Sequence, residues 1–155
     1  METLLDLNQT TIEAAQDLVR YTKGSADFYR EAAGVVKSPV LERAFRNLAE
    51  TRGRHSGELG SHLKLNGAEV PETANLRDRM HETWTKLRGM LNGGDNYVLL
   101  IEAERAEDRI KAAYEQLIKD TAGSALSPVL HAQYAEVKAS HDEIRNTRDM
   151  FAATR

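Results

Sequence analysis

The tetrapeptide Ser-Pro-Val-Leu occurs twice in this chain of 155 residues, at positions 38–41 and again at positions 127–130. A serine can accept hydrogen bonds from the unpaired amides of a first helical turn, and a proline is tolerated there because it has no N–H to leave unpaired. Each copy therefore predicts the start of a helix. Their separation of 89 positions raises the question of whether the two halves of the chain share a structure.

Apolar residues at helical spacing surround both copies, and breakers separate the segments. Gly34 is expected at the left-handed position that ends the first helix. Asn66-Gly67 is expected to stop the second helix, and the run NGGD at 92–95 is expected to end the shorter helix that follows it. No segment has the pattern of a strand. The predicted helices cover about residues 9–33, 39–65, 72–91, 96–119 and 128–151.

The two halves align beyond the tetrapeptide. With the same offset of 89, Phe45 falls on Tyr134 and Leu48 on Val137, and all four are apolar positions of their helices. An offset of 81 aligns the first helix with the third long one. The matched pairs are Leu18 with Leu99, Val19 with Leu100, Tyr29 with Ile110 and Val36 with Leu117.

Ser-Pro is a frequent helix start, so it could occur twice by chance, and the other matches could be chance as well. The number of agreeing apolar positions nevertheless favours a repeated helical hairpin. Two antiparallel hairpins with one long connection form the ferritin-like arrangement. The predicted fold is therefore all-α, with a single domain over residues 1–155. It is a ferritin-like up-down-up-down four-helix bundle in which residues 72–91 form a crossing helix between the hairpins.

Composition narrows the function classes. The formal net charge of -3 provides no basic field for nucleic acid or for an anionic membrane. The absence of cysteine excludes disulfides and thiolate metal sites, and it fits a reducing compartment. The first residues, METLLDLNQTT, lack the features of a signal peptide, and no apolar run is long enough to span a bilayer. We expect a cytoplasmic protein with no nucleic-acid partner and no membrane partner.

Polar residues at inward positions of the helices are the candidates for function. In the last helix, His141 falls in the apolar series Leu130, Tyr134, Val137 and Ile144. The steps of this series alternate four and three residues, which keeps one helix face buried.

Glu107 takes a similar place in the third long helix, between Ala103 and Ile110. At about 1.5 Å per residue, Glu107 and His141 both lie roughly 18–20 Å from the loop that joins their helices, so they are expected at one level. In the second helix, Arg52 and His55 are further polar residues expected to face the interior.

A buried charge needs a partner or a metal, and two interpretations of this cluster remain open. In the first, Arg52, Glu107 and His141 form a buried polar network that fixes the register of the bundle. In the second, Glu107 and His141 bind iron, manganese or zinc, with His55 and Glu58 as further ligands.

The first interpretation is favoured, because the Glu-x-x-His motif of di-iron bundles does not occur in this chain. His55-x-x-Glu58 has the reverse order and fits a solvated pair equally well. The counterpart of Glu107 at the offset of 81 is Ala26, which cannot bind a metal.

Three stretches carry a family resemblance: FRNLAETR at 45–52, ERAED at 104–108 and YAEVKASHD at 134–142. They resemble a bacterial family of ferritin-like four-helix bundles that is known only as a domain of unknown function. The resemblance extends over about residues 7–150. It implies an up-down-up-down bundle in a bacterial cytosol with no established activity, and stress-related expression and metal binding are suggested for relatives.

Arg52, Glu107 and His141 fall at positions that look typical of that family. Its members often carry an acid where this chain has Ala26, and this departure counts against a complete metal site.

No catalytic residue is predicted, because the chain lacks cysteine, a Gly-x-Ser-x-Gly motif and a glycine-rich phosphate loop. The expected function is that of a non-enzymatic helical bundle that acts through association, with a homodimer as the simplest partner. The alternative is a metal-binding protein that uses Glu107 and His141. A di-iron oxidase is the least favoured class.

Overall fold

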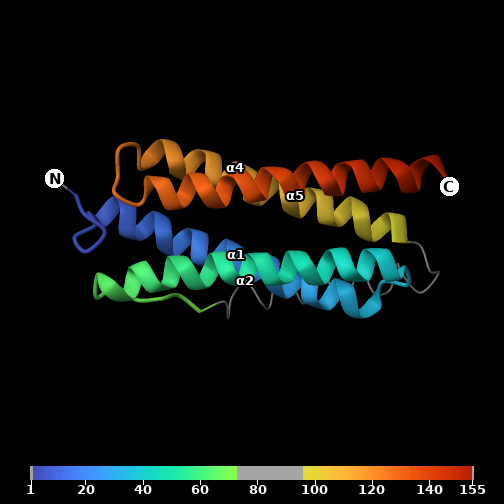
Figure 1. Cartoon of the computed structure of the whole chain (residues 1–155), viewed down its shortest axis with the longest axis horizontal. Coiled ribbons are helices and arrows are strands. Elements are labelled where there is room, and N and C mark those ends of the chain that lie inside the picture. Colours follow the sequence, from blue (N-terminus) through green and yellow to red (C-terminus); the bar gives the residue numbers. More distant parts are fainter. Residues whose placement is uncertain (1, 73–95, 155) are drawn as a thin grey trace.

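The computed structural model describes residues 2–72 and 96–154. Within those ranges the chain forms four long helices (Figure 1). They are α1 (Gln9–Val35), α2 (Pro39–Leu65), α4 (Asn96–Asp120) and α5 (Ser127–Ala153). The fold is therefore all-α as predicted, and the helix bounds agree with the sequence pattern to within two residues. The predicted crossing helix at 72–91 lies, apart from its first residue, outside the described residues.

Side-chain caps explain where two of the helices begin. The Asn8 side chain accepts a hydrogen bond from the amide of Thr11 at the start of α1, at 2.9 Å. The Ser38 hydroxyl accepts one from the amide of Leu41 at 3.3 Å. The second Ser-Pro pair also opens a helix, but α5 already includes Ser127 and has no side-chain cap. Both copies of the tetrapeptide thus start helices, and only the first uses its serine as a cap.

One of the predicted helix ends is wrong. α1 continues through Gly34 to Val35 and ends on Val36 in an extended conformation, with φ of -64°. Among the described glycines, only Gly67 and Gly123 have a positive φ, at 65° and 81°. Gly67 follows the last turn of α2 and donates its amide to the Lys64 carbonyl, so the predicted stop at Asn66-Gly67 is confirmed.

The helices pack as two hairpins, α1 with α2 and α4 with α5. The amide of Lys37 lies 3.3 Å from the Asn96 side-chain oxygen, which places the start of α4 beside the turn between α1 and α2. At the other end, the amide of Ala125 lies 3.2 Å from the Glu2 carboxylate. α2 and α4 therefore run in the same direction (Figure 1).

The predicted up-down-up-down order is thus wrong, and the observed order is up, down, down, up. The physical reason is that α2 ends and α4 begins at opposite ends of the bundle, so the two helices are not joined by a short turn. The described residues after Leu65 lie along α1. Gln16 donates to the Glu69 carbonyl at 3.0 Å, and Lys23 donates to the Pro71 carbonyl at 2.8 Å, so this segment follows α1 away from the end of α2.

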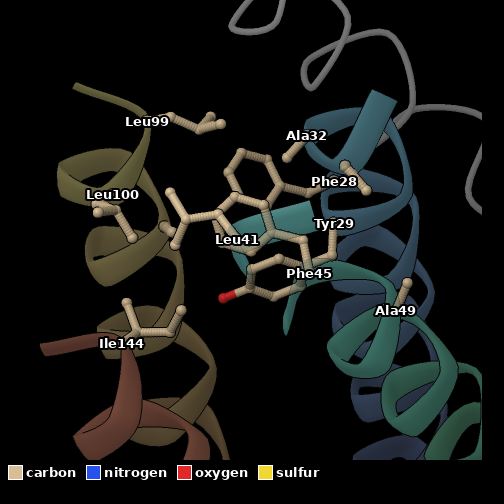
Figure 2. Close-up of a cluster of buried hydrophobic side chains, with 11 residues drawn as sticks. Phe28, Tyr29, Ala32, Leu41, Phe45, Ala49, Leu99, Leu100 and Ile144 are labelled. Carbon is tan, nitrogen blue, oxygen red and sulfur yellow. The ribbon is translucent and has the colours of Figure 1, made fainter. Parts of the chain in front are cut away.

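Two separate apolar clusters fill the interior. The cluster near the turn between α1 and α2 contains Phe28, Tyr29 and Phe45, with Leu100 from α4 and Ile144 from α5 (Figure 2). The aromatic rings pack closely, with centroids 5.2 Å apart for Phe28 and Tyr29 and 5.6 Å apart for Tyr29 and Phe45. The other cluster lies toward the amino-terminal segment. Its members include Leu7, Leu18, Leu59, Leu63, Ile110, Tyr114, Leu130 and Val137.

None of the described helices combines the length and the apolar character needed to cross a membrane. Each has one buried face, and the rest of its surface carries mostly polar and charged side chains, with a few exposed apolar ones such as Val40 and Leu65.

Two glycines of the first hairpin should respond to alanine in opposite ways. Gly57 lies on the exposed face of α2, where an added Cβ would meet no described atom within 4 Å. Gly57→Ala should raise the free energy of unfolding by about 0.5–1 kcal/mol, because alanine favours helix. Gly67→Ala should lower it by about 1–2 kcal/mol, because the φ of 65° is strained for alanine.

Urea denaturation of the parent and both variants would measure these changes. A less stable Gly57→Ala variant would contradict the first expectation, and it would indicate that this face of α2 is covered.

Candidate functional site

A charged layer separates the two apolar clusters, and each helix contributes one side chain to it. Ser25 comes from α1, Arg52 from α2, Glu107 from α4 and Ser140 from α5. The side chains of Arg52 and Glu107 are both 0% exposed. The layer therefore places a full ion pair in the middle of the bundle, away from the bulk solvent.

Arg52 and Glu107 form a two-pronged pair. The distances are 2.9 Å from Nη1 of Arg52 to Oε2 of Glu107 and 2.8 Å from Nη2 to Oε1. Nη1 also donates to the Ser25 hydroxyl at 2.9 Å, and Nη2 donates to the Ser140 hydroxyl at 2.6 Å. Ser140 in turn lies 2.6 Å from Oε1 of Glu107. Parallel N–H···O bonds of this kind are among the strongest in proteins.

The surroundings keep Arg52 charged. Burial is the largest single influence on Arg52 and lowers its pKa, but the Glu107 carboxylate and the nearby tyrosines outweigh it, so the pKa rises overall. Removing two charges from water is costly, and only close geometry with additional hydrogen bonds can offset that cost. The hydroxyls of Ser25 and Ser140 supply such bonds.

Tyr29 lies against this network. Its ring centroid is 6.0 Å from the Cζ atom of Arg52, within reach of a cation–π interaction. Burial, the negative charge of Glu107 and the closeness of its carboxylate to the phenol hydroxyl raise the pKa of Tyr29 well above its ordinary value. The phenol is therefore neutral at physiological pH. Its hydroxyl is buried beside Glu107 but makes no hydrogen bond of ordinary geometry to the described residues.

A second polar layer lies toward the amino-terminal end and centres on Gln133 of α5. The Tyr114 hydroxyl donates to Oε1 of Gln133 at 2.7 Å. The Gln133 amide lies 3.2 Å from the His55 carbonyl and 2.9 Å from the Glu58 carboxylate. Burial raises the pKa of Tyr114 well above its usual value, so it too is a neutral donor. This layer joins α2, α4 and α5.

His55 stands at the edge of the second layer. Its Nε2 lies 3.2 Å from Oε2 of Glu136, which also pairs with Arg54 at 2.5 Å. The ring is buried, and Nδ1 has no partner among the described atoms. Burial is the main cause that lowers the pKa of His55, and the nearby Arg52 and Arg54 add to it.

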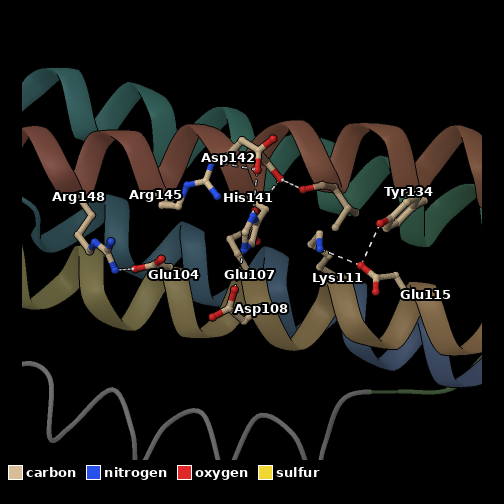
Figure 3. Close-up of polar contacts among 12 residues, drawn as sticks. Glu104, Glu107, Asp108, Lys111, Glu115, Tyr134, His141, Asp142, Arg145 and Arg148 are labelled. Carbon is tan, nitrogen blue, oxygen red and sulfur yellow. Dashed lines mark hydrogen bonds and ion pairs between the residues drawn. The ribbon is translucent and has the colours of Figure 1, made fainter.

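His141 lies on the flank between α4 and α5 (Figure 3). Its Nε2 is 2.6 Å from the Asp108 carboxylate, and its Nδ1 is 3.2 Å from that of Asp142. Since Ser140 contacts Glu107 and His141 contacts Asp108, Glu107 and His141 do share one level, as their heights predicted. The position next to Arg52 belongs, however, to the preceding residue, Ser140.

The structure does not bring the four predicted metal ligands together. Glu107 binds Arg52 and Ser140, and Glu58 accepts from Gln133. His55 and His141 face different carboxylates, those of Glu136 and Asp108. Within residues 2–72 and 96–154, no three His, Asp or Glu side chains form a group that could hold a metal ion.

Sequence reasoning named Arg52 and Glu107 but missed Ser25, Ser140 and Gln133. One signal was available. Gln133 and Ser140 fit between Leu130, Val137 and Ile144 with steps of three and four, just as Tyr134 and His141 do with steps of four and three. The structure buries Gln133 and Ser140.

The site thus defines a class of protein: a helical bundle of two hairpins joined across a buried, two-pronged ion pair. A family model described as "Domain of unknown function (DUF2383)" matches residues 10–120, and the chain belongs to this family. The match covers Ser25, Arg52 and Glu107 but ends before α5. No curated protein matches the chain.

Glu107→Gln should be the most destabilising of the single charge changes. It leaves the Arg52 guanidinium buried without a counter-charge, which costs about 3–5 kcal/mol. The matched control is Glu42→Gln, which breaks the exposed pair with Arg46 and should cost about 0.3–0.5 kcal/mol. Chemical denaturation of both variants would test this difference, and equal losses would show that the buried pair contributes no more than a surface pair.

Two neighbouring residues of α5 should differ in their effect on stability. Ser140→Ala removes a hydroxyl that contacts both charged partners, and it should lower the free energy of unfolding by about 1–3 kcal/mol. His141→Ala should lower it by less than about 1 kcal/mol, because its partners Asp108 and Asp142 are 61% and 45% exposed. Thermal unfolding of the two variants checks the order, which would reverse if His141 were the residue of the network.

His55 should make the protein less stable in weak acid. Its pKa is lowered by folding from the ordinary value of 6.5, so the unfolded chain takes up the proton first as the pH falls. The stabilising contribution is complete above about pH 7 and declines as the pH falls below about 6.5. His55→Gln should flatten this part of the stability curve. The exposed His131→Gln is the control, and an identical slope in both variants and the parent would contradict the assignment.

Proposed function

We propose that the chain is a non-enzymatic, ferritin-like helical bundle whose polar interior is structural and whose role lies in association with other protein surfaces. The observation that carries this proposal is the pairing of Glu107 with Arg52. Both of its carboxylate oxygens already bind the guanidinium, and one of them also contacts Ser140. A metal ion at Glu107 would lie against the positive charge of Arg52, which opposes a second cation there.

The arrangement of the helices supports the ferritin-like assignment. Two antiparallel hairpins with a single long connection between α2 and α4 are typical of ferritin-like folds. Such bundles often build metal sites from inward carboxylates and histidines. In this chain the inward positions at the middle of the bundle hold an arginine, a glutamate and two serines instead.

Exposed apolar side chains at the end of the bundle that carries the amino-terminal segment support a role in association. Leu5 and Leu65 are 69% and 60% exposed. They lie near each other, because the Asn66 side chain donates to the carbonyl of Leu4. A second copy of the chain is the partner that we propose for this end. A cytoplasmic location and a stress-related role belong to the same proposal and rest on the family resemblance.

The test combines molecular mass and metal content on untagged protein. Light scattering after size exclusion should give the mass of a dimer for the parent and for Val40→Asp, which adds a charge near the other end of α2. It should give a monomer for Leu5→Asp combined with Leu65→Asp. Metal analysis after incubation with ferrous iron, manganese or zinc should find no stoichiometric metal.

Two results would overturn the proposal. One is a parent that stays monomeric at about 100 µM, a concentration at which a dimer with a Kd of about 1 µM would be almost fully formed. The other is stoichiometric metal in the parent that is lost in Glu107→Gln, which would establish the metal-binding alternative.

A further inference from the structure

Five buried polar atoms have no hydrogen-bond partner among the described residues, and two of them, Oη of Tyr29 and Nε of Arg52, lie at the charged layer. Buried polar groups in native proteins are nearly always paired, so each exception requires an explanation. Since both side chains lie beside Glu107, one kind of partner can serve the two atoms.

We infer that the charged layer binds internal water at the Tyr29 hydroxyl and at Nε of Arg52. The Nε–H group can only donate, so its partner must be an acceptor. The Tyr29 hydroxyl can both donate and accept. A third contact is available at Glu107, whose Oε2 atom accepts one hydrogen bond, from Arg52, while Oε1 contacts both Arg52 and Ser140. Internal waters typically make about three such bonds.

The chemistry of the layer selects a small neutral ligand. A cation would meet the Arg52 guanidinium, and an anion would meet the Glu107 carboxylate. These two groups already neutralise each other at 2.8 and 2.9 Å. Tyr29, Arg52 and Glu107 are each 0% exposed, so no open path admits a larger molecule. Water is neutral and small, and it can donate and accept at once.

The two fully buried tyrosines of the bundle provide an internal comparison. Tyr29 and Tyr114 are both 0% exposed, and each lies near a polar layer. The Tyr114 hydroxyl donates directly to Gln133 at 2.7 Å, so its requirement is met by protein. The Tyr29 hydroxyl has no such partner. Only Tyr29 should therefore depend on bound water.

The test is nuclear magnetic resonance of the ¹⁵N-labelled parent, which detects long-lived water through cross-peaks between its protons and the Nε–H proton of Arg52. We expect such a cross-peak in the parent, with the sign of a water held for longer than a nanosecond. Tyr29→Phe should lose or strongly weaken it, because the bound water loses one of its partners. Tyr114→Phe is the matched control and should keep it.

Two results would overturn the inference. The first is an Arg52 Nε–H signal in the parent that shows no cross-peak to water, and this result needs no variant to fold. The second is a Tyr29→Phe variant that retains the full cross-peak and has a higher melting temperature than the parent. In that case the tyrosine hydroxyl binds nothing, and its removal only abolishes the free-energy cost of burying an unpaired polar group.

Discussion

The ion pair between Arg52 and Glu107 restricts how the two hairpins can pack, because both side chains are fully buried and each comes from a different hairpin. Arg52 belongs to α2 and Glu107 to α4. In the charged layer, the other residue from each hairpin is a serine, which cannot neutralise the charge. Each hairpin therefore carries an uncompensated buried charge until it meets the other in the correct register. A shift of either hairpin by one helical turn would separate the charges by about 5 Å and leave both in an apolar interior.

This constraint shapes the rest of the interior. The apolar residues fall into two clusters because the charged layer occupies the space between them. The contacts between α2 and α5 are made largely by long polar side chains, including Arg52 with Ser140, Arg54 with Glu136 and Gln133 with Glu58. Apolar packing supplies the bulk of the stabilisation at both ends, while the polar layers determine how the hairpins pair.

The described helices, the stop at Gly67 and the candidacy of Arg52 and Glu107 could be predicted from the sequence, since each depends on local pattern or on the cost of an unpaired charge. The sequence left open whether Glu107 pairs with Arg52 or binds a metal together with His141. It could not decide between two registers of α5. Leu130, Val137 and Ile144 are seven residues apart, and a helix of about 3.6 residues per turn leaves either Ser140 or His141 as the intermediate inward residue. Only the fit of the small Ser140 hydroxyl between Arg52 and Glu107 resolves the choice. The direction of α4 was equally inaccessible, because it depends on the path of a long connection and not on any property of the helix itself.

The two-pronged pair also restricts how this protein can change over time. Loss of either partner leaves the other charged and buried, so the two positions behave as one unit in which single substitutions are costly and double substitutions are not. A chain that replaced both with apolar residues of similar volume could keep its stability and join its two clusters into one continuous core. It would then lose the feature that distinguishes one pairing of the hairpins from another. Positions 52 and 107 should therefore vary together or not at all.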